Sequence, residues 1–441
     1  MEKKQTLLTS RRFLPMFLTQ FFGALNDNVY KQSLLLVITY GLIQNTSNNI
    51  SILNNLAALL FILPYFIFSA TAGQIADKFE RSQLIRYIKL LEIGIMIIGS
   101  CGFLLGHISL LLFSLFLMGV HSTFFGPIKY AILPEILKPN ELMTGNALFQ
   151  TGTSLAILFG MILGGAVISI SHDHLMWVCV TVLTIALLGY ISSRFILKQP
   201  LNDDHLTIDW NFFRTSWQTM AYAKSIPLIY LILLGNSWYW FYGASYLTQI
   251  PELTHKYLNA SENVVSLLLT FFSVGIGIGS LLCRKIGGSE VNIKMVPIGA
   301  FGLTVFAFYL AGALYFVPEQ AVTLQLSDIF THGWVYYHVM LAIILLGISG
   351  GFYIVPLYAL MQAYSPQSHR ARIVAANNIY NAIFMVASAI FSILILSVLK
   401  IDMKVLFCIT AILSAIFSFW LLRKIQPLMK EHRPSEDKTN A

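Results

Sequence analysis

Long apolar segments recur along the whole chain and constrain its fold more than any other feature. Each is bounded by charged or Asn/Pro-rich breaks, and each is long enough, at about 20 residues or more, to cross a bilayer as a helix. They lie at about 14–43, 51–76, 83–105, 108–133, 143–170, 175–197, 226–255, 263–284, 294–317, 336–363, 371–399 and 402–423. The sequence therefore predicts an all-α polytopic membrane protein with twelve transmembrane helices.

The composition excludes several classes of function. Of the 441 residues, 56% are hydrophobic and 11% are charged, whereas soluble domains carry about 25% charged residues. A soluble enzyme, a nucleic-acid-binding domain and a disordered chain are therefore excluded. The lipid bilayer is the expected partner, nucleic acid is not, and a monomer is expected.

The basic residues predict the orientation. On this map of spans, 23 of the 28 Lys and Arg residues lie on the N-terminal side of the membrane, and Lys31 and Lys129 lie within spans. Loops rich in Lys and Arg stay in the cytoplasm. Both termini are therefore expected in the cytoplasm, as an even number of spans also requires.

The longest connection divides the spans six and six. The predicted units are an N-terminal half at 1–197, a linker at 198–225, a C-terminal half at 226–425 and a cytoplasmic tail at 426–441. Within the linker, Asp209 is expected to cap a short amphipathic helix that lies along the inner membrane surface. The apolar side chains of that helix are Trp210, Phe213, Trp217 and Met220.

The two halves resemble each other in sequence. Pro127 in the segment 126–131 corresponds to Pro356 in the segment 355–360, and Asn146 corresponds to Asn377 at nearly the same offset. Such an offset fits a duplicated six-helix unit, the architecture of the major facilitator superfamily, although apolar helices also resemble each other by chance.

Three ionisable residues fall inside predicted spans. Asp27 and Lys31 share one face of the first helix, and Lys129 lies near the end of the fourth. A charge at membrane depth costs at least ~2.5 kcal/mol, so each needs a partner or a polar cavity. In one interpretation Asp27 meets a substrate cation, Lys129 meets a phosphate or carboxylate, and Lys31 pairs with Asp27. In the other, all three form a structural salt-bridge cluster.

The second half has almost no intramembrane charge, and its seventh span is instead rich in aromatic and amide side chains. In one interpretation these side chains form an aromatic wall of a cavity that suits an amphiphile. In the other, they pack helices together or lie at the membrane interface. The candidate substrate-binding residues are Asp27, Tyr30, Lys31, Lys129, Trp238, Trp240, Tyr242, Tyr246, Gln249, Tyr353, Asn377 and Asn378.

The loop after the second span carries a gating motif. Residues 73–81 resemble the superfamily pattern G-x-x-x-D-[RK]-x-G-R, but Glu80 stands where glycine is usual. The resemblance implies a cytoplasmic latch against the second half, and a solvated run of charges is the alternative. The candidate gating residues are Gly73, Asp77, Lys78 and Arg81.

Two motifs of ATP-driven and metal-dependent enzymes are missing from the sequence. There is no G-x-x-x-x-G-K-[ST] loop and no H-E-x-x-H. The four cysteines are spread along the chain, too far from one another for a C-x-x-C site. The glycines at 275–279 are expected to allow close helix packing instead of binding a phosphate. No catalytic activity, cofactor or metal is expected.

Four segments indicate a family. Residues 21–28, 126–130 and 350–360 resemble the bacterial lysophospholipid transporters, and 370–378 is similar to the transporter module often fused to an acyltransferase and an acyl-carrier-protein synthetase. The resemblance implies inward flipping of lysophospholipids, chiefly lysophosphatidylethanolamine, across the inner membrane of a Gram-negative bacterium for re-acylation. A separate acyltransferase and acyl-carrier-protein synthetase would then be partners.

Asp27 and Lys129 match polar positions of that family's first half, but the arginine that some members carry in the seventh span is absent. Two alternatives stay open. One is a proton-coupled carrier of another amphipathic solute, such as a drug or siderophore. The other is a transport-inactive docking platform for an acyltransferase.

Overall fold

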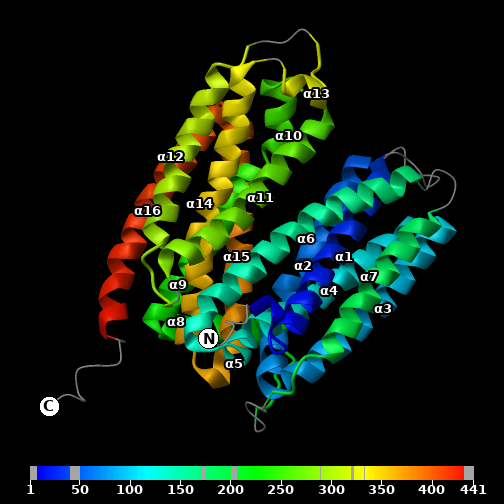
Figure 1. Ribbon diagram of the computed structural model, residues 1–441, viewed down its shortest axis with the longest axis vertical. Coiled ribbons are helices and arrows are strands. Elements are labelled where there is room, and N and C mark those ends of the chain that lie inside the picture. The colour runs from blue at the N-terminus through cyan, green and yellow to red at the C-terminus, as the bar shows by residue number, and fades with distance from the viewer. Residues whose placement is uncertain are drawn as a thin grey trace, which may run out of the picture.

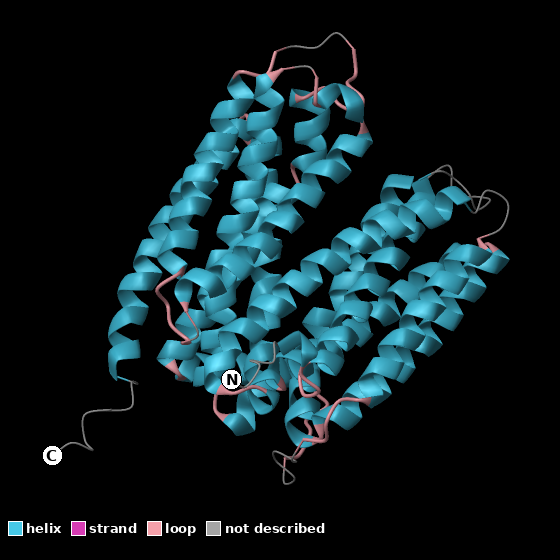
Figure 2. Cartoon of the chain, in the orientation of Figure 1, coloured by secondary structure: helices cyan, strands magenta, loops and turns pink. Residues whose placement is uncertain are grey.

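The computed structural model describes residues 7–39, 50–170, 175–199, 206–288, 290–318, 322–331 and 333–431. Helices dominate these residues (Figures 1 and 2). Twelve long helices lie within these ranges. They are α1 (Leu14–Thr39), α2 (Ile50–Lys78), α3 (Arg81–Leu105), α4 (Ile108–Ala131), α6 (Leu142–Ile170), α7 (Met176–Arg194), α9 (Pro227–Leu247), α11 (Glu262–Gly287), α12 (Val296–Tyr315), α14 (Trp334–Tyr364), α15 (Arg370–Ile393) and α16 (Met403–Glu431).

Shorter elements connect the long helices. The longest of them is the linker helix α8 (Phe212–Ser225), and the others are only one or two turns long. They are the turn Leu7–Thr9, α5 (Leu133–Ile136), the turn Pro139–Glu141, α10 (Ile250–Glu252), the π-helix Leu253–Tyr257, α13 (Leu326–Ile329), the turn Gln367–His369 and the π-helix Leu394–Val398.

The predicted fold class, an all-α polytopic membrane protein, is confirmed. Within the described ranges, ten helices are long and apolar enough to cross a membrane. The two other long helices, α1 and α9, carry the polar residues discussed below. The seventh span ends at Leu247 instead of about residue 255, and α10 restarts with Pro251 in its first turn, because proline cannot donate a hydrogen bond to the preceding turn.

The long helices form two groups. Helices α1–α7, the first bundle, lie on one side of Figure 1, and helices α9–α16, the second bundle, lie on the other. The bundles meet at the end that carries α5 and α8, the linker end, and diverge toward the opposite end (Figure 1). Where the bundles meet, α2, α4 and α6 pack against α11, α14 and α15.

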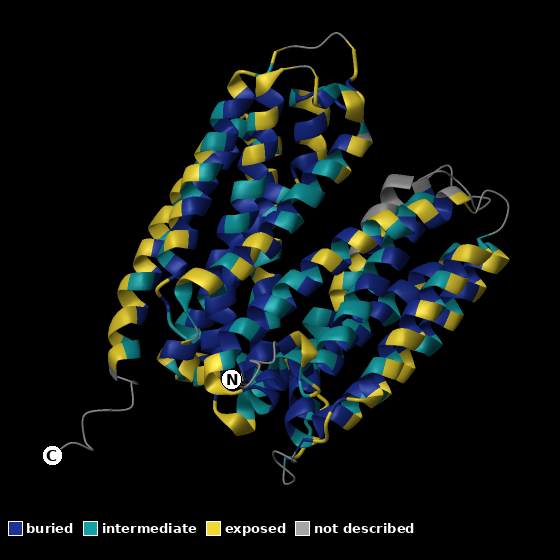
Figure 3. Ribbon diagram, in the orientation of Figure 1, coloured by how far each residue is buried: buried dark blue, intermediate teal, exposed yellow. Residues whose placement is uncertain are grey.

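The outer faces of both bundles carry many exposed residues (Figure 3), and large apolar residues are among them. Leu90, Phe159, Phe301 and Ile416 are each at least 49% exposed. Large apolar side chains exposed in this number are unfavourable in water, so these faces require lipid. Buried residues concentrate inside each bundle and between the bundles at the linker end.

Glycine allows the closest helix contact in the second bundle, as the sequence predicts. A Cβ atom on Gly279 of α11 would collide with the carbonyl oxygen of Ile348 in α14. A Cβ on Gly347 would collide with the carbonyl oxygen of Phe272. Backbones at this separation exclude any side chain, so the glycine-rich segment packs helices and binds no phosphate.

The linker helix begins at a different cap from the one predicted. The side-chain oxygen of Asn211 accepts a hydrogen bond from the backbone N–H of Arg214 at 3.1 Å. Asp209 acts one step earlier, because its carboxylate accepts from the N–H of Asn211 at 2.9 Å. Asn211 is therefore the N-cap of α8, and the prediction of Asp209 is wrong by two residues.

The two faces of α8 differ strongly in exposure. Thr215 and Thr219 are buried where α8 packs against α2 and α15. On the other face, Phe213 is 78% exposed and Trp217 is 73% exposed, and Trp210, which precedes the helix, is 71% exposed. The helix is therefore amphipathic with its apolar face turned away from the protein.

Candidate functional site

Asp27 and Lys31 do not form the predicted ion pair. The hydroxyl of Ser122 in α4 donates a hydrogen bond to the Asp27 carboxylate at 2.9 Å. The ammonium of Lys31 lies 4.2 Å from the ring centroid of Phe61 in α2. Among the described ion pairs none joins Asp27 to Lys31 within 4.0 Å. The partners of Asp27 and Lys31 therefore come from the neighbouring helices α4 and α2. The sequence of α1 alone does not reveal them.

Lys129 also rests on an aromatic ring. Its ammonium lies 4.9 Å from the ring centroid of Tyr130. The Tyr130 ring stacks on Tyr358 of α14, with centroids 4.6 Å apart. Lys129 therefore lies next to the place where the two bundles meet. A cation on an aromatic face gains about 0.5–2 kcal/mol and keeps its capacity to bind an anion.

A buried charged cluster in the first bundle was missed by the sequence reasoning. Lys89 and Glu92 of α3 pair at 2.6 Å, and Nε2 of His121 in α4 lies 3.3 Å from the same Glu92 oxygen. The amide of Asn26 in α1 donates to the other Glu92 oxygen at 2.9 Å. Lys89 is fully buried inside the first bundle. The signal was the Lys-x-x-Glu spacing inside the third span.

Three aromatic candidates of α9 take part in helix packing. The hydroxyl of Tyr242 donates to the Leu303 carbonyl oxygen at 2.7 Å, and that of Tyr246 donates to the Phe407 carbonyl oxygen at 2.7 Å. The indole N–H of Trp238 donates to Ser414 at 3.2 Å in α16. The polar groups of all three residues therefore form hydrogen bonds within the second bundle. This favours a packing role over an aromatic wall that contacts the substrate.

Three further candidates lie away from the charged residues. Tyr30 is fully buried, and its hydroxyl donates to the Leu111 carbonyl oxygen at 2.9 Å. Tyr353 is also fully buried inside the second bundle. The amide of Gln249 donates to the adjacent Thr248 at 3.1 Å, beyond the end of α9.

The remaining candidates gather where the bundles meet. Trp240 is 40% exposed, and polar groups of Trp240 and Asn377 surround the hydroxyl of Tyr358. The amide of Asn378 lies beside the first bundle, 3.2 Å from where a Cβ on Gly126 would be. The structure therefore brings Trp240, Asn377 and Asn378 to the same contact as Tyr130, which follows Lys129 in α4.

The predicted gating residue Asp77 holds the two bundles together at the linker end. Its carboxylate accepts hydrogen bonds from the backbone N–H groups of Ala371 and Arg372 at 2.9 and 3.1 Å. It also accepts from Nε of Arg372 at 3.1 Å and from Arg81 at 3.1 Å. A carboxylate at the N-terminus of α15 satisfies helix N–H groups that have no partner within the helix.

Two of the other gating candidates share this contact. Arg81 is fully buried and pairs with Glu135 as well as with Asp77. A Cβ on Gly73 would lie 2.7 Å from the Cβ of Ala375, so glycine allows α2 to touch α15. Lys78 is not part of the contact, because its ammonium lies over the ring of Phe79.

A second polar contact joins the bundles nearby. The side-chain amides of Asn146 in α6 and Gln362 in α14 exchange two hydrogen bonds, at 2.8 and 3.0 Å. The hydroxyl of Thr151 donates to the Gly277 carbonyl oxygen at 3.1 Å. Glu135, Arg372 and Gln362 were not among the sequence candidates, because their partners lie on distant segments of the chain.

Glu80 explains the departure from the loop motif. Its carboxylate caps α3, accepting from the N–H groups of Ser82 and Gln83 at 2.9 and 2.8 Å, and it accepts from the N–H of Gln199 in the linker at 2.8 Å. Burial raises the pKa of Glu80, but the hydrogen bonds from Gln199 and Ser82 outweigh it and lower the pKa below the ordinary value. Glycine in this position offers no such bonds.

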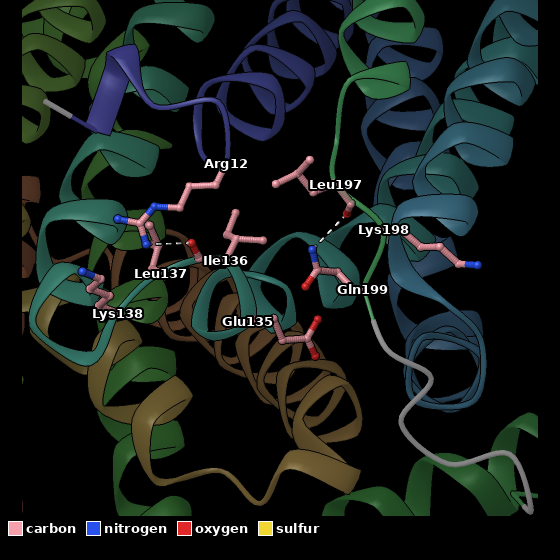
Figure 4. A pocket seen from close by; sticks show the side chains of 8 residues that line it. All are labelled: Arg12, Glu135, Ile136, Leu137, Lys138, Leu197, Lys198 and Gln199. Carbon is pink, nitrogen blue, oxygen red and sulfur yellow. Dashed lines mark hydrogen bonds between the residues drawn. The ribbon is translucent and has the colours of Figure 1, made fainter. Parts of the chain in front are cut away.

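A surface pocket of about 350 Å³ opens at the linker end (Figure 4). Arg12, Glu135, Lys138, Lys198 and Gln199 contribute its polar lining. It is separate from the residues around Asp27 and Lys129. Within the described ranges no group of three His, Cys, Asp or Glu side chains is placed to hold a metal ion.

Comparison with known proteins identifies the family. The model of the Major Facilitator Superfamily matches residues 16–316 and, in a second match, 239–441. The chain belongs to the major facilitator superfamily. A solved major facilitator transporter, FucP in the outward conformation, superposes with a TM-score of 0.70 at 12% identity, covering 94% of this chain and 99% of that one. This likeness concerns the fold alone.

Curated relatives in the superfamily carry a specific name. The lysophospholipid transporter LplT of Serratia proteamaculans (strain 568) is 25% identical over 365 residues, 80% of this chain and 81% of the relative. The protein of the same name from Pectobacterium carotovorum subsp. carotovorum (strain PC1) is 26% identical over 367 residues, 81% of this chain and 79% of the relative. This major facilitator protein is a multi-pass bacterial membrane transporter.

Proposed function

We propose that this transporter moves lysophospholipids such as lysophosphatidylethanolamine across the bacterial inner membrane by alternating access. The moving units would be the halves 1–197 and 226–425, joined by the linker 198–225. The relatives named as lysophospholipid transporters, which match about four fifths of this chain, support the substrate class. A separate acyltransferase and acyl-carrier-protein synthetase would use the delivered lipid.

The arrangement of charges in the first bundle carries this proposal. Asp27 is held by a neutral hydroxyl, and the ammonium groups of Lys31 and Lys129 rest on aromatic rings. Opposite charges at membrane depth are costly when they stay apart. A zwitterionic headgroup offsets that cost, with its amine on Asp27 and its phosphate on Lys129 or Lys31.

The second bundle suits the acyl chain. Away from their end turns, the helices α9, α11, α12, α14, α15 and α16 contain no Asp, Glu, Lys or Arg except Arg423 and Lys424, about two turns before the end of α16. Trp240 is the most exposed of the predicted aromatic residues of α9. An apolar surface with one indole N–H binds a hydrocarbon chain without desolvating a charge.

The contact at the linker end supports a working orientation. The basic residues favour cytoplasmic termini, which puts the Asp77 contact on the cytoplasmic side and the diverging ends of the bundles on the outer side (Figure 1). In this orientation the described arrangement receives lipid from the outer leaflet. Release toward the cytoplasm then requires α15 to leave Asp77.

The test is reconstitution in liposomes with fluorescent lysophosphatidylethanolamine in one leaflet, with flipping followed by chemical quenching. We expect Asp27→Asn and Lys129→Ala to flip the lipid at least about tenfold more slowly, a loss of ~1.4 kcal/mol. Ser33→Ala is the matched control, because Ser33 is buried in the same helix as Asp27 and its hydroxyl donates to the backbone carbonyl oxygen of Gly164. It should stay within about twofold of the wild type.

Three outcomes would contradict the proposal. Wild-type liposomes that flip no faster than empty ones exclude the activity. Flux of another amphipathic solute that collapses with an uncoupler, with no competition by lysophospholipid, indicates a proton-coupled carrier. Unchanged flipping in both variants, with loss of a co-purifying acyltransferase, indicates a docking platform.

A further inference from the structure

The buried contacts of the first bundle close into a ring. Asn26 and Asp27 are neighbours in α1, and His121 and Ser122 are neighbours in α4. Glu92 of α3 receives the amide of Asn26 at 2.9 Å and lies 3.3 Å from His121. On the other side of the same two helices, Ser122 donates to Asp27 at 2.9 Å. Three helices are therefore joined by one continuous path of contacts.

Glu92 is fixed in place by its own partner. Lys89 pairs with it at 2.6 Å from the preceding turn of α3. The Lys89 ammonium occupies space left by Gly23, where a Cβ would collide with Nζ, and it lies 4.9 Å from the ring centroid of Phe125. Glu92 is 2% exposed and Lys89 is fully buried, so neither reaches a ligand.

Asp27 occupies the accessible side of the ring. Its side chain is partly exposed, whereas Asn26 is fully buried. Consecutive residues on a helix point about 100° apart, so a contact that fixes Asn26 also fixes the direction of Asp27. The same relation connects His121, on the Glu92 side, with Ser122, on the Asp27 side.

We propose that Glu92 is a positioning residue that orients Asp27 toward the lipid headgroup, acting through Asn26 and through the His121–Ser122 pair. This inference rests on the proposed function, in which Asp27 binds the headgroup amine. Of the two carboxylates in this ring of contacts, Glu92 is neutralised by Lys89. Asp27 therefore remains to bind the amine of the headgroup. Positioning of this kind affects binding more than it affects the conformational step of transport.

The variant for the test is Lys89→Met/Glu92→Gln. It removes both charges together, because a single substitution would leave an uncompensated charge in the interior. Ser100→Ala is the matched control, since Ser100 is a buried residue of the same helix and is not part of the ring of contacts. Monodisperse elution in detergent verifies folding of each variant before reconstitution.

We expect the lipid mole fraction that gives half-maximal flipping to rise about tenfold in Lys89→Met/Glu92→Gln, with the maximal rate within about twofold of the wild type. Adding Asp27→Asn to this variant should then give no more loss than Asp27→Asn alone. Residues that act through one another give such non-additive effects, whereas independent sites add. Additive losses, or an unchanged half-maximal mole fraction, overturn the inference.

A second measurement needs no substrate. The rate at which a hydrophobic carbodiimide modifies Asp27, read by mass spectrometry of the intact transporter, reports how firmly Ser122 holds the carboxylate. We expect this rate to rise at least about fivefold in Lys89→Met/Glu92→Gln and to stay unchanged in Ser100→Ala. An unchanged rate in the double variant overturns the inference, even if lysophosphatidylethanolamine is not transported.

Discussion

Glu80 joins two parts of the chain at the linker end, the start of α3 and the backbone of Gln199. Because these bonds are made to the ionised carboxylate, its pKa is lowered and its contribution to stability is present at neutral pH. That contribution is lost as the pH falls below the ordinary glutamate range, through the lowered pKa of the folded protein. The hydrogen bonds of Glu80 therefore predict that part of the stability of the fold is lost in acid.

We expect the wild type to lose thermal stability between about pH 5 and pH 3 more steeply than Glu80→Gln does. At pH 7 the Glu80→Gln variant should be the less stable of the two. Thermal unfolding in detergent across this pH range is the measurement. Glu252→Gln is the control, since Glu252 is exposed and its nearest cation, Lys256, is 4.0 Å away. Parallel pH curves for wild type and Glu80→Gln would contradict the prediction.

Single residues were predictable only where one helix contains the whole signal. Asp27 and Lys129 stand out because a charge inside an apolar run is rare. The roles of Tyr242 and Tyr246 were not predictable, because helical spacing does not reveal whether a hydroxyl meets a backbone carbonyl of a neighbouring helix. Lys89 was overlooked because it lies within two turns of the end of its span, where lysine normally reaches water.

Among the elements, α8 has an apolar face that no part of the described protein covers. Phe213 and Trp217 are exposed there, and Arg214 and Lys224 lie on the same short helix. Aromatic and basic side chains in this combination favour the interface of an anionic leaflet. The linker helix is therefore expected to lie in the cytoplasmic membrane surface, next to the helices that carry Asp77 and Arg372.

Lipids brominated near the headgroup should quench Trp210 and Trp217. We expect the Trp210→Phe/Trp217→Phe variant to lose about half or more of the shallow quenching seen in wild-type proteoliposomes. Trp238→Phe is the control, because Trp238 is stacked on Phe417 with ring centroids 4.4 Å apart inside the second bundle. Equal quenching in the wild type and the double variant would place α8 in water.

The long helices were predictable because apolar length is a local property. Their ends were less so: the seventh helix ends early at a proline turn, and α16 continues to Glu431, into the predicted tail 426–441. The remainder of that tail lies outside the described residues. The cap of α8 was misassigned because Asp209 and Asn211 are both good capping residues two positions apart.

For the whole molecule, the Asp77 contact sets which end is closed. Removing one partner of a buried ion pair costs about 3–5 kcal/mol. If the conformation with an open linker end has a population of about 1% in the wild type, destabilising the closed conformation by ~3 kcal/mol raises that population to about 60%. Asp77→Asn should therefore open the linker end and bring the opposite ends of the bundles together.

Spin labels at His107→Cys and Phe316→Cys report this motion, because His107 is the N-cap of α4 and Phe316 is the C-cap of α12, both away from the linker end. Cys101, which is exposed, is replaced by serine. We expect a shorter distance to become the major population in Asp77→Asn and in Gly73→Leu, where a side chain would collide with α15. Lys78→Ala should leave the distance unchanged. Identical distributions in all variants would refute a latch.

The packing of one bundle against the other was only partly predictable. The repeat of the proline segments and the loop motif indicate a duplicated fold and a contact near Asp77. The reciprocal bonds of Asn146 and Gln362, and the role of Glu135, depend on which residues of distant helices face each other. No local pattern contains that information.

The proposed headgroup contacts all come from one bundle, which has a thermodynamic consequence. When the second bundle rocks, Asp27, Lys31 and Lys129 move as a rigid group, and only the reservoir that they face changes. The headgroup is then held with equal strength on both sides of the membrane. Equal affinities predict the same half-saturating lysophospholipid concentration in both leaflets. Without coupling to another gradient, net flow then follows the difference in lysophospholipid concentration between the leaflets, and acylation on one side sets its direction.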